Sequence, residues 1–133
     1  MHPHPALITL LNMLLLAFAT YAVGRARGKY GVKVPATTGP DGFERAFRAH
    51  MNTIEATVIF LPVLWIAAMY NPLQPLWVAV FGYVWIVGRV WYLLGYLQAA
   101  EKRSAGFGVA GIAWVGLLVL AVWGVIKAML LAM

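Results

Sequence analysis

The chain of 133 residues contains no cysteine, and its four acidic residues are outnumbered by ten lysines and arginines. Without cysteine this chain can form no disulfide, no zinc–thiolate site and no cysteine nucleophile, and we expect no metal cofactor. Charged residues make up only 11% of the chain, whereas 63% are hydrophobic. A soluble domain of this size cannot bury so much apolar surface, so the composition predicts a membrane protein.

Four hydrophobic segments divide the chain, at about 5–23, 43–70, 76–97 and 106–131. Each is long enough to cross a hydrocarbon core as a helix, which takes roughly 20 residues. Backbone polar groups must be satisfied internally in lipid, which favours helices over other structures. We therefore predict an all-α fold, an integral membrane four-helix bundle that forms a single domain over residues 1–133, with a loop at 24–42.

The net charge of +6 would suggest a nucleic-acid partner in a soluble protein. Here the basic residues at 25–33 and 102–103 lie beside hydrophobic segments, where they indicate topology instead. The positive-inside rule places these two connections in the cytoplasm and both termini outside, and we expect no nucleic-acid partner.

The second segment carries Arg48, Asn52 and Glu55 at positions i, i+4 and i+7. At about 100° per residue, these side chains share an arc of roughly 60° on one helix face. An ionisable group in a membrane helix is costly and usually marks a functional site. The simpler alternative is a buried ion pair, Arg48 with Glu55 or Arg89 with Glu55, that fixes the packing of the helices.

A second polar face lies on the third segment, where Arg89, Tyr92 and Tyr96 are spaced i, i+3 and i+7. If that helix continues unbroken, Arg103 returns to within roughly 40° of Arg89. Arginine pairs with carboxylates, glutamate can hold an ammonium group, and tyrosine donates neutral hydrogen bonds. A guanidinium can also lower the pKa of a nearby thiol. The two faces together therefore suit a zwitterionic ligand with several functional groups. His50 has no clear partner, and the six tryptophans are interpreted as interface anchors and lipid-facing residues.

Two motifs resemble the MAPEG superfamily, the membrane-associated proteins in eicosanoid and glutathione metabolism. They are Phe43-Glu-Arg-x-x-Arg-Ala-x-x-Asn-x-x-Glu55 and Gly88-Arg-Val-Trp-Tyr-Leu-Leu-Gly-Tyr96, the second followed by Arg103. The resemblance implies a homotrimer that binds glutathione between neighbouring subunits near the cytosolic side. It implies that Arg103 stabilises the glutathione thiolate and that Arg89 supports the surrounding network. The positions it assigns to glutathione binding are Arg27, Arg48, Asn52, Glu55, Arg89, Tyr92, Tyr96 and Ser104.

The branch of the family stays open, because Gly28 and Ala56 differ from the leukotriene-forming branch and Ser104 resembles the prostaglandin-forming one. We expect a glutathione transferase of a bacterial inner membrane. It would conjugate lipophilic electrophiles and, as a variant, reduce lipid hydroperoxides. One alternative is a non-catalytic lipid-binding member of the family, which the retained Arg103 argues against. The other is a proton-coupled exporter of lipophilic cations that uses Glu55, which the nearby arginines argue against.

Overall fold

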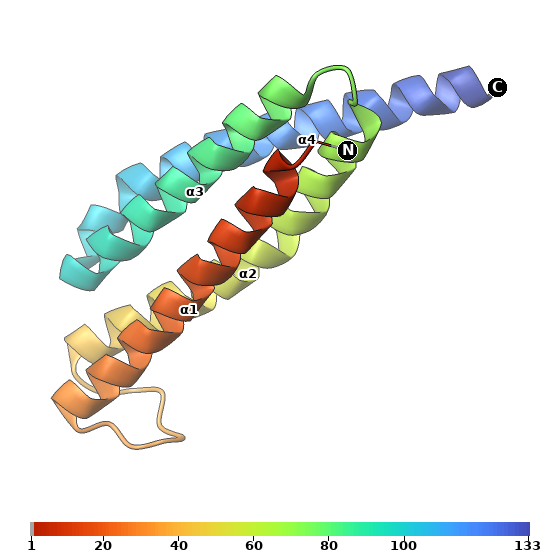
Figure 1. The fold of residues 1–133 in the computed structure, drawn as a ribbon. Coiled ribbons are helices and arrows are strands. Elements are labelled where there is room, and N and C mark those ends of the chain that lie inside the picture. Colours follow the sequence, from red (N-terminus) through yellow and green to blue (C-terminus); the bar gives the residue numbers. More distant parts are fainter. Residues whose placement is uncertain (1) are drawn as a thin grey trace.

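The structure, a computed structural model, describes residues 2–133. The chain forms four long helices: α1 (His4–Tyr30), α2 (Asp41–Tyr70), α3 (Pro75–Gln98) and α4 (Ser104–Ala132). A short 3-10 turn, η1 (Ala100–Arg103), precedes α4 (Figure 1). All four are long and apolar enough to span a membrane, and the described residues contain no strand. The prediction of an all-α membrane bundle is confirmed.

The two ends of the bundle differ in what they carry (Figure 1). Both termini and the turn at 71–74 lie at one end, which we call the termini end. The loop at 31–40 and η1 lie at the other, which we call the loop end. Because the basic residues at 25–33 and 102–103 belong to the loop end, the charge asymmetry seen in the sequence is also an asymmetry of the folded bundle.

Helix α1 is seven residues longer at its end than the sequence analysis expected, and the loop is correspondingly shorter. The helix ends where Gly31 takes a left-handed φ of 68° and its N–H donates to the carbonyl of Arg27. Arg27 and Lys29 lie in the last turn, where positive charge is favourable at the negative end of the helix dipole. The basic residues 25–29 are therefore held on a rigid helix and not in a loop.

The core of the bundle contains a stacked pair of rings, Phe60 on α2 and Trp85 on α3, whose centroids lie 3.6 Å apart. Trp85 is only 2% exposed, so the interpretation of the six tryptophans as interface anchors and lipid-facing residues was wrong for this one. Helix α2 runs through Pro62 without a break. Next to this proline, the indole of Trp114 on α4 donates to the carbonyl of Ile59, 2.8 Å away.

Helices α3 and α4 touch through their backbones near the loop end. A Cβ atom added to Gly106 would collide with the backbone of Tyr92 and Gly88, and one added to Gly88 would lie 2.6 Å from the backbone nitrogen of Ala110. Small residues allow this close approach of membrane helices. The contact places the first turn of α4, with Ser104, directly beside Tyr92.

Candidate functional site

A cavity of about 660 Å³ opens between α2, α3 and the start of α4. We call it the polar groove. Its lining comprises Phe47, Arg48, Met51, Asn52, Glu55, Tyr92, Tyr96, Arg103, Ser104 and Phe107. The fold thus brings together seven of the nine residues that the sequence analysis predicted for the site. Their roles as ligands remain predictions.

Arg103 reaches the groove by a route that the sequence analysis did not expect. Helix α3 ends at Gln98, and Ala99 is extended with φ −162° and ψ 147°, so the assumption of an unbroken helix was wrong. The turn η1 then folds back over Gly95, where a Cβ would collide with the carbonyl of Lys102. As a result, the guanidinium carbon of Arg103 lies 5.0 Å from the centroid of the Tyr96 ring.

The charged groups of the groove lie on its open side. In the single chain Arg48, Glu55 and Arg103 are exposed, whereas Tyr92 and Tyr96 are buried in the wall. Glu55 is fourteen residues from the start of α2 and fifteen from its end, so this carboxylate sits halfway along a spanning helix. A bare charge there is costly in lipid. The groove therefore requires a polar occupant or a covering protein surface, and Arg48 with Glu55 is not a buried ion pair.

Arg89 lies behind the groove and does not line it. The side chain is 2% exposed, and its Nη2 donates to Asn52 Oδ1 and to Thr53 Oγ1, each over 2.9 Å. The guanidinium carbon lies 4.0 Å from the centroid of the Tyr92 ring. Within residues 2–133, its hydrogen bonds go to neutral groups, so the structure does not show the lock between Arg89 and Glu55 that we considered. Arg89 holds groove residues in place.

Arg27 is not among the residues that line the groove. Its Nη1 donates to the carbonyl of Ala36 over 2.8 Å, and its guanidinium carbon lies 5.0 Å from the centroid of the Phe43 ring. In the single chain Arg27 thus ties α1 to the following loop. Its contact with glutathione, which the resemblance implies across a subunit interface, stays a prediction.

Several hydrogen bonds between polar side chains could not be predicted from the sequence, because they join residues that are far apart in it. Asn12 on α1 is fully buried and donates to Thr57 Oγ1 over 3.2 Å, while Thr57 donates to the carbonyl of Thr53. His50, for which we found no partner, lies 3.2 Å from the hydroxyl of Thr20. The only sequence signal for these groups was a polar residue within an apolar helix, as at Asn12, and it does not identify the partner.

Three apolar lining residues, Phe47, Met51 and Phe107, were also missed. Phe47, Met51 and Glu55 are spaced i, i+4 and i+8 on α2, so a wider arc around the face of Arg48, Asn52 and Glu55 would have included the two apolar residues. Phe107 is set only by the packing of α4 on α3. These side chains give the polar groove an apolar rim.

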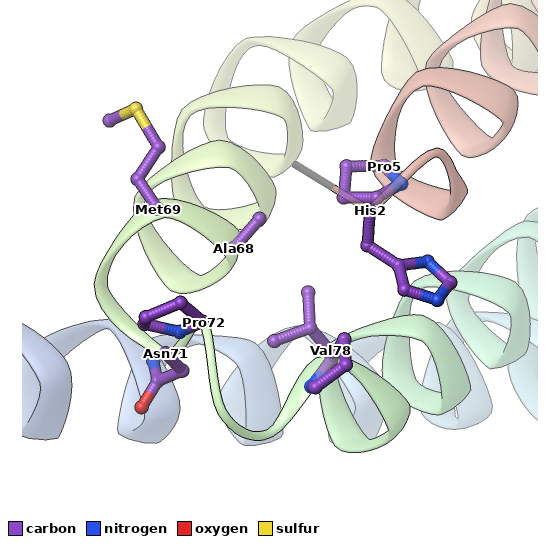
Figure 2. A pocket seen from close by; sticks show the side chains of 8 residues that line it. His2, Pro5, Ala68, Met69, Asn71, Pro72 and Val78 are labelled. Carbon is purple, nitrogen blue, oxygen red and sulfur yellow. The ribbon is translucent and has the colours of Figure 1, made fainter.

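A second cavity, of about 330 Å³, lies at the termini end, between the N-terminal residues, the end of α2 and the start of α3. Figure 2 shows His2, Pro5, Met69 and Asn71 around it. Its described lining contains no lysine, arginine or acid. It therefore offers none of the charge pattern that distinguishes the polar groove.

The fold and the groove define a class: a helical, four-span integral membrane protein with a charged cavity between its helices at one end. Residues 5–123 match the MAPEG family, and the chain belongs to this family. The resemblance found in the sequence is thereby confirmed.

Several curated proteins are similar to the chain. An uncharacterized protein of Synechocystis sp. is 49% identical over 108 residues, which covers 81% of this chain and 77% of that protein. Microsomal glutathione S-transferase 2 of Mus musculus is 40% identical over 102 residues, covering 77% of this chain and 68% of the relative. Leukotriene C4 synthase of Cavia porcellus is 40% identical over 100 residues, which covers 75% of this chain and 65% of that protein.

Proposed function

We propose that the protein is a glutathione S-transferase that conjugates lipophilic electrophiles within the membrane. The observation that carries the proposal is the polar groove, where two arginines, a glutamate and an asparagine meet two tyrosines on a single cavity. The names of two relatives, a microsomal glutathione S-transferase and a leukotriene C4 synthase, support the same chemistry.

The charges of the groove complement those of glutathione. This tripeptide has two carboxylates, one ammonium group, two amides and a thiol. Arg48 and Arg103 supply cations for carboxylate or thiolate, Glu55 supplies an anion for the ammonium group, and Asn52 can serve an amide. A volume of about 660 Å³ also falls within the usual range for small-molecule sites, about 300–1,000 Å³.

Arg103 is the residue that we propose to act on sulfur. It is the last residue of η1 and lies against the ring of Tyr96, so its position is restricted while its charge faces the groove. A fixed positive charge favours the thiolate over the thiol. The thiol proton leaves to solvent and the sulfur forms a C–S bond with the electrophilic carbon. The electron pair of the breaking bond departs with the leaving group or, for an epoxide, stays on the ring oxygen, which then takes up a proton.

The acceptor would approach from the apolar side. Beyond Glu55, a cavity of about 580 Å³ follows the seam between α2 and α4, and its lining begins at Val58 and Trp114. This lining is aliphatic and aromatic, unlike that of the polar groove. A lipophilic acceptor in this seam would bring its electrophilic end toward the sulfur held near Arg103.

We further propose that the protein is a homotrimer in which a neighbouring subunit covers the open side of the groove. The exposed charges of Arg48 and Glu55, of which Glu55 sits halfway along a spanning helix, support such a cover. Arg27 of the neighbouring subunit would then reach glutathione. The basic loop end would face the cytoplasm of a bacterium, with both termini outside.

The deciding experiment is an ultraviolet titration of purified protein with glutathione, following thiolate absorbance near neutral pH. We expect a thiolate signal in the wild type that Arg103→Ala removes and Arg103→Lys partly keeps. The matched control is Lys102→Ala, because Lys102 lies next to Arg103 in the chain but its Nζ donates to Gln98, away from the groove. Equal signals in wild type and Arg103→Ala would refute the role of Arg103. Binding of glutathione without turnover of any electrophile would refute transferase activity.

A further inference from the structure

A smaller cavity, of about 230 Å³, lies between α1, the start of α2 and the end of α3. We call it the α1 cavity. Its lining comprises Phe18, Tyr21, Ala22, Arg25, Ala26, Lys29, Tyr30, Gly42, Ala46 and Leu97. It shares no lining residue with the polar groove, and the proposed transfer reaction makes no use of it.

The α1 cavity is cationic on one helix face. Arg25 and Lys29 are exposed and stand four residues apart on α1, so they project from the same side. Arg27 lies about 180° away on the same helix and is engaged with Ala36. Among the described residues that line the cavity, none is acidic. The cavity therefore presents two neighbouring positive charges without a neutralising carboxylate in its wall.

The same face becomes apolar toward the middle of the membrane. Phe18 and Tyr21, two turns and one turn before Arg25, are 44% and 63% exposed. The small side chains of Ala22 and Ala26 and the aliphatic side chain of Leu97 complete the apolar wall of the cavity. At the loop end the cavity is closed by Tyr30, whose ring packs so tightly over Gly42 that a Cβ there would collide with it. The result is a cavity with a cationic edge and an apolar wall that leads into the bilayer.

We propose that the α1 cavity binds an anionic phospholipid of the leaflet at the loop end. The lipid phosphate lies between Arg25 and Lys29, and one acyl chain runs along Phe18 and Tyr21. Basic pockets between membrane helices suit anionic headgroups. A soluble anion such as phosphate would use the two cations but not the exposed aromatic wall. A zwitterionic lipid would use the wall, but its positive headgroup amine would oppose the cations.

The test is native mass spectrometry of the full chain in detergent, equilibrated with equal amounts of phosphatidylglycerol and phosphatidylcholine carrying identical acyl chains. Each cation near a membrane surface contributes about fivefold to the binding of an anionic lipid, so the two cations of the wild type should together give a preference for phosphatidylglycerol of roughly 25-fold. The double variant Arg25→Gln/Lys29→Gln should bind both lipids about equally. Arg25→Lys should keep most of the preference, which would show that the loss follows charge and not misfolding.

Lys127→Gln is the matched control, since it removes one cation near the termini end of α4, beside Trp123. It should leave the lipid preference unchanged. Three outcomes would overturn the proposal: a preference that survives the double substitution, a preference lost equally in Lys127→Gln, or displacement of phosphatidylglycerol by millimolar inorganic phosphate. The last outcome would identify a site for soluble anions. None of these readouts depends on glutathione, so the transferase proposal stands or falls separately.

Discussion

Arg89 donates a hydrogen bond of 2.9 Å to the side-chain oxygen of Asn52, although Asn52 lines the polar groove and Arg89 lies wholly behind it. Because this oxygen is engaged by the guanidinium, the amide nitrogen of Asn52 is the group left for a ligand. Thr53 Oγ1 receives a second bond from the same nitrogen of Arg89. The buried arginine thereby sets which hydrogen-bonding group the groove presents at Asn52.

This relationship predicts that Arg89→Gln weakens glutathione binding without direct contact. A hydrogen bond to a charged group contributes about 1.5 kcal/mol, so the dissociation constant should rise by roughly tenfold. Isothermal titration calorimetry measures it. If Arg89 acts through Asn52, Arg89→Gln should reduce the affinity for glutathione less in the Asn52→Ala background than in the wild type. Fully additive losses would contradict the link.

Glu55→Gln should weaken glutathione binding by about tenfold, because it removes the negative charge proposed to hold the ammonium group. Glutathione that lacks its amino group provides the control: it should bind wild type and the variant equally. Both affinities can be measured by calorimetry. A variant that loses affinity for both ligands alike would show that Glu55 does not contact the amine. Cation flux in vesicles that disappears in Glu55→Gln would instead favour the exporter.

Two glycines of α4 should respond in opposite directions to the same substitution. Gly106→Ala places a Cβ against the backbone of Tyr92 and should lower the free energy of unfolding by about 1–3 kcal/mol. Gly108 has no atom within 4 Å of its added Cβ, so Gly108→Ala should raise it by about 0.5–1 kcal/mol through helix propensity. Thermal unfolding in detergent compares them. Equal shifts would argue against the tight contact of α3 and α4.

The buried bond between Asn12 and Thr57 predicts a coupled effect on stability. Thr57→Val leaves the amide of Asn12 buried without an acceptor and should cost about 1–3 kcal/mol. In the double variant Asn12→Leu/Thr57→Val both polar groups are gone, so it should be more stable than the sum of the single losses suggests. Unfolding free energies of all four proteins give the coupling. Strict additivity would show that this bond contributes nothing.

Much of the polar groove could be predicted from local spacing. Arg48, Asn52 and Glu55 share a face because they lie on one helix, and any fold that keeps α2 helical keeps them together. The position of Arg103 was predicted for the wrong reason: α3 ends at Gln98, and a tight turn against Gly95 places Arg103 where an unbroken helix was expected to. Arg89 and Tyr92 are three residues apart and were expected on the same face of α3. However, the side chain of Arg89 points toward Asn52 and Thr53 and not into the cavity.

The sequence by itself determined that this chain crosses the membrane as four helices and that α2 and α3 each carry one polar face. Hydrophobic length and the 3.6-residue helical period are local properties, and they depend on no other part of the chain. Only the tertiary structure decided which partner each polar group meets: Asn12 with Thr57, Arg89 with Asn52, Arg103 with Tyr96. Such pairs depend on the rotation and axial position of each helix relative to its neighbours. Backbone contacts between helices, such as that of Gly106 with Tyr92, set this arrangement, and local sequence spacing does not encode it.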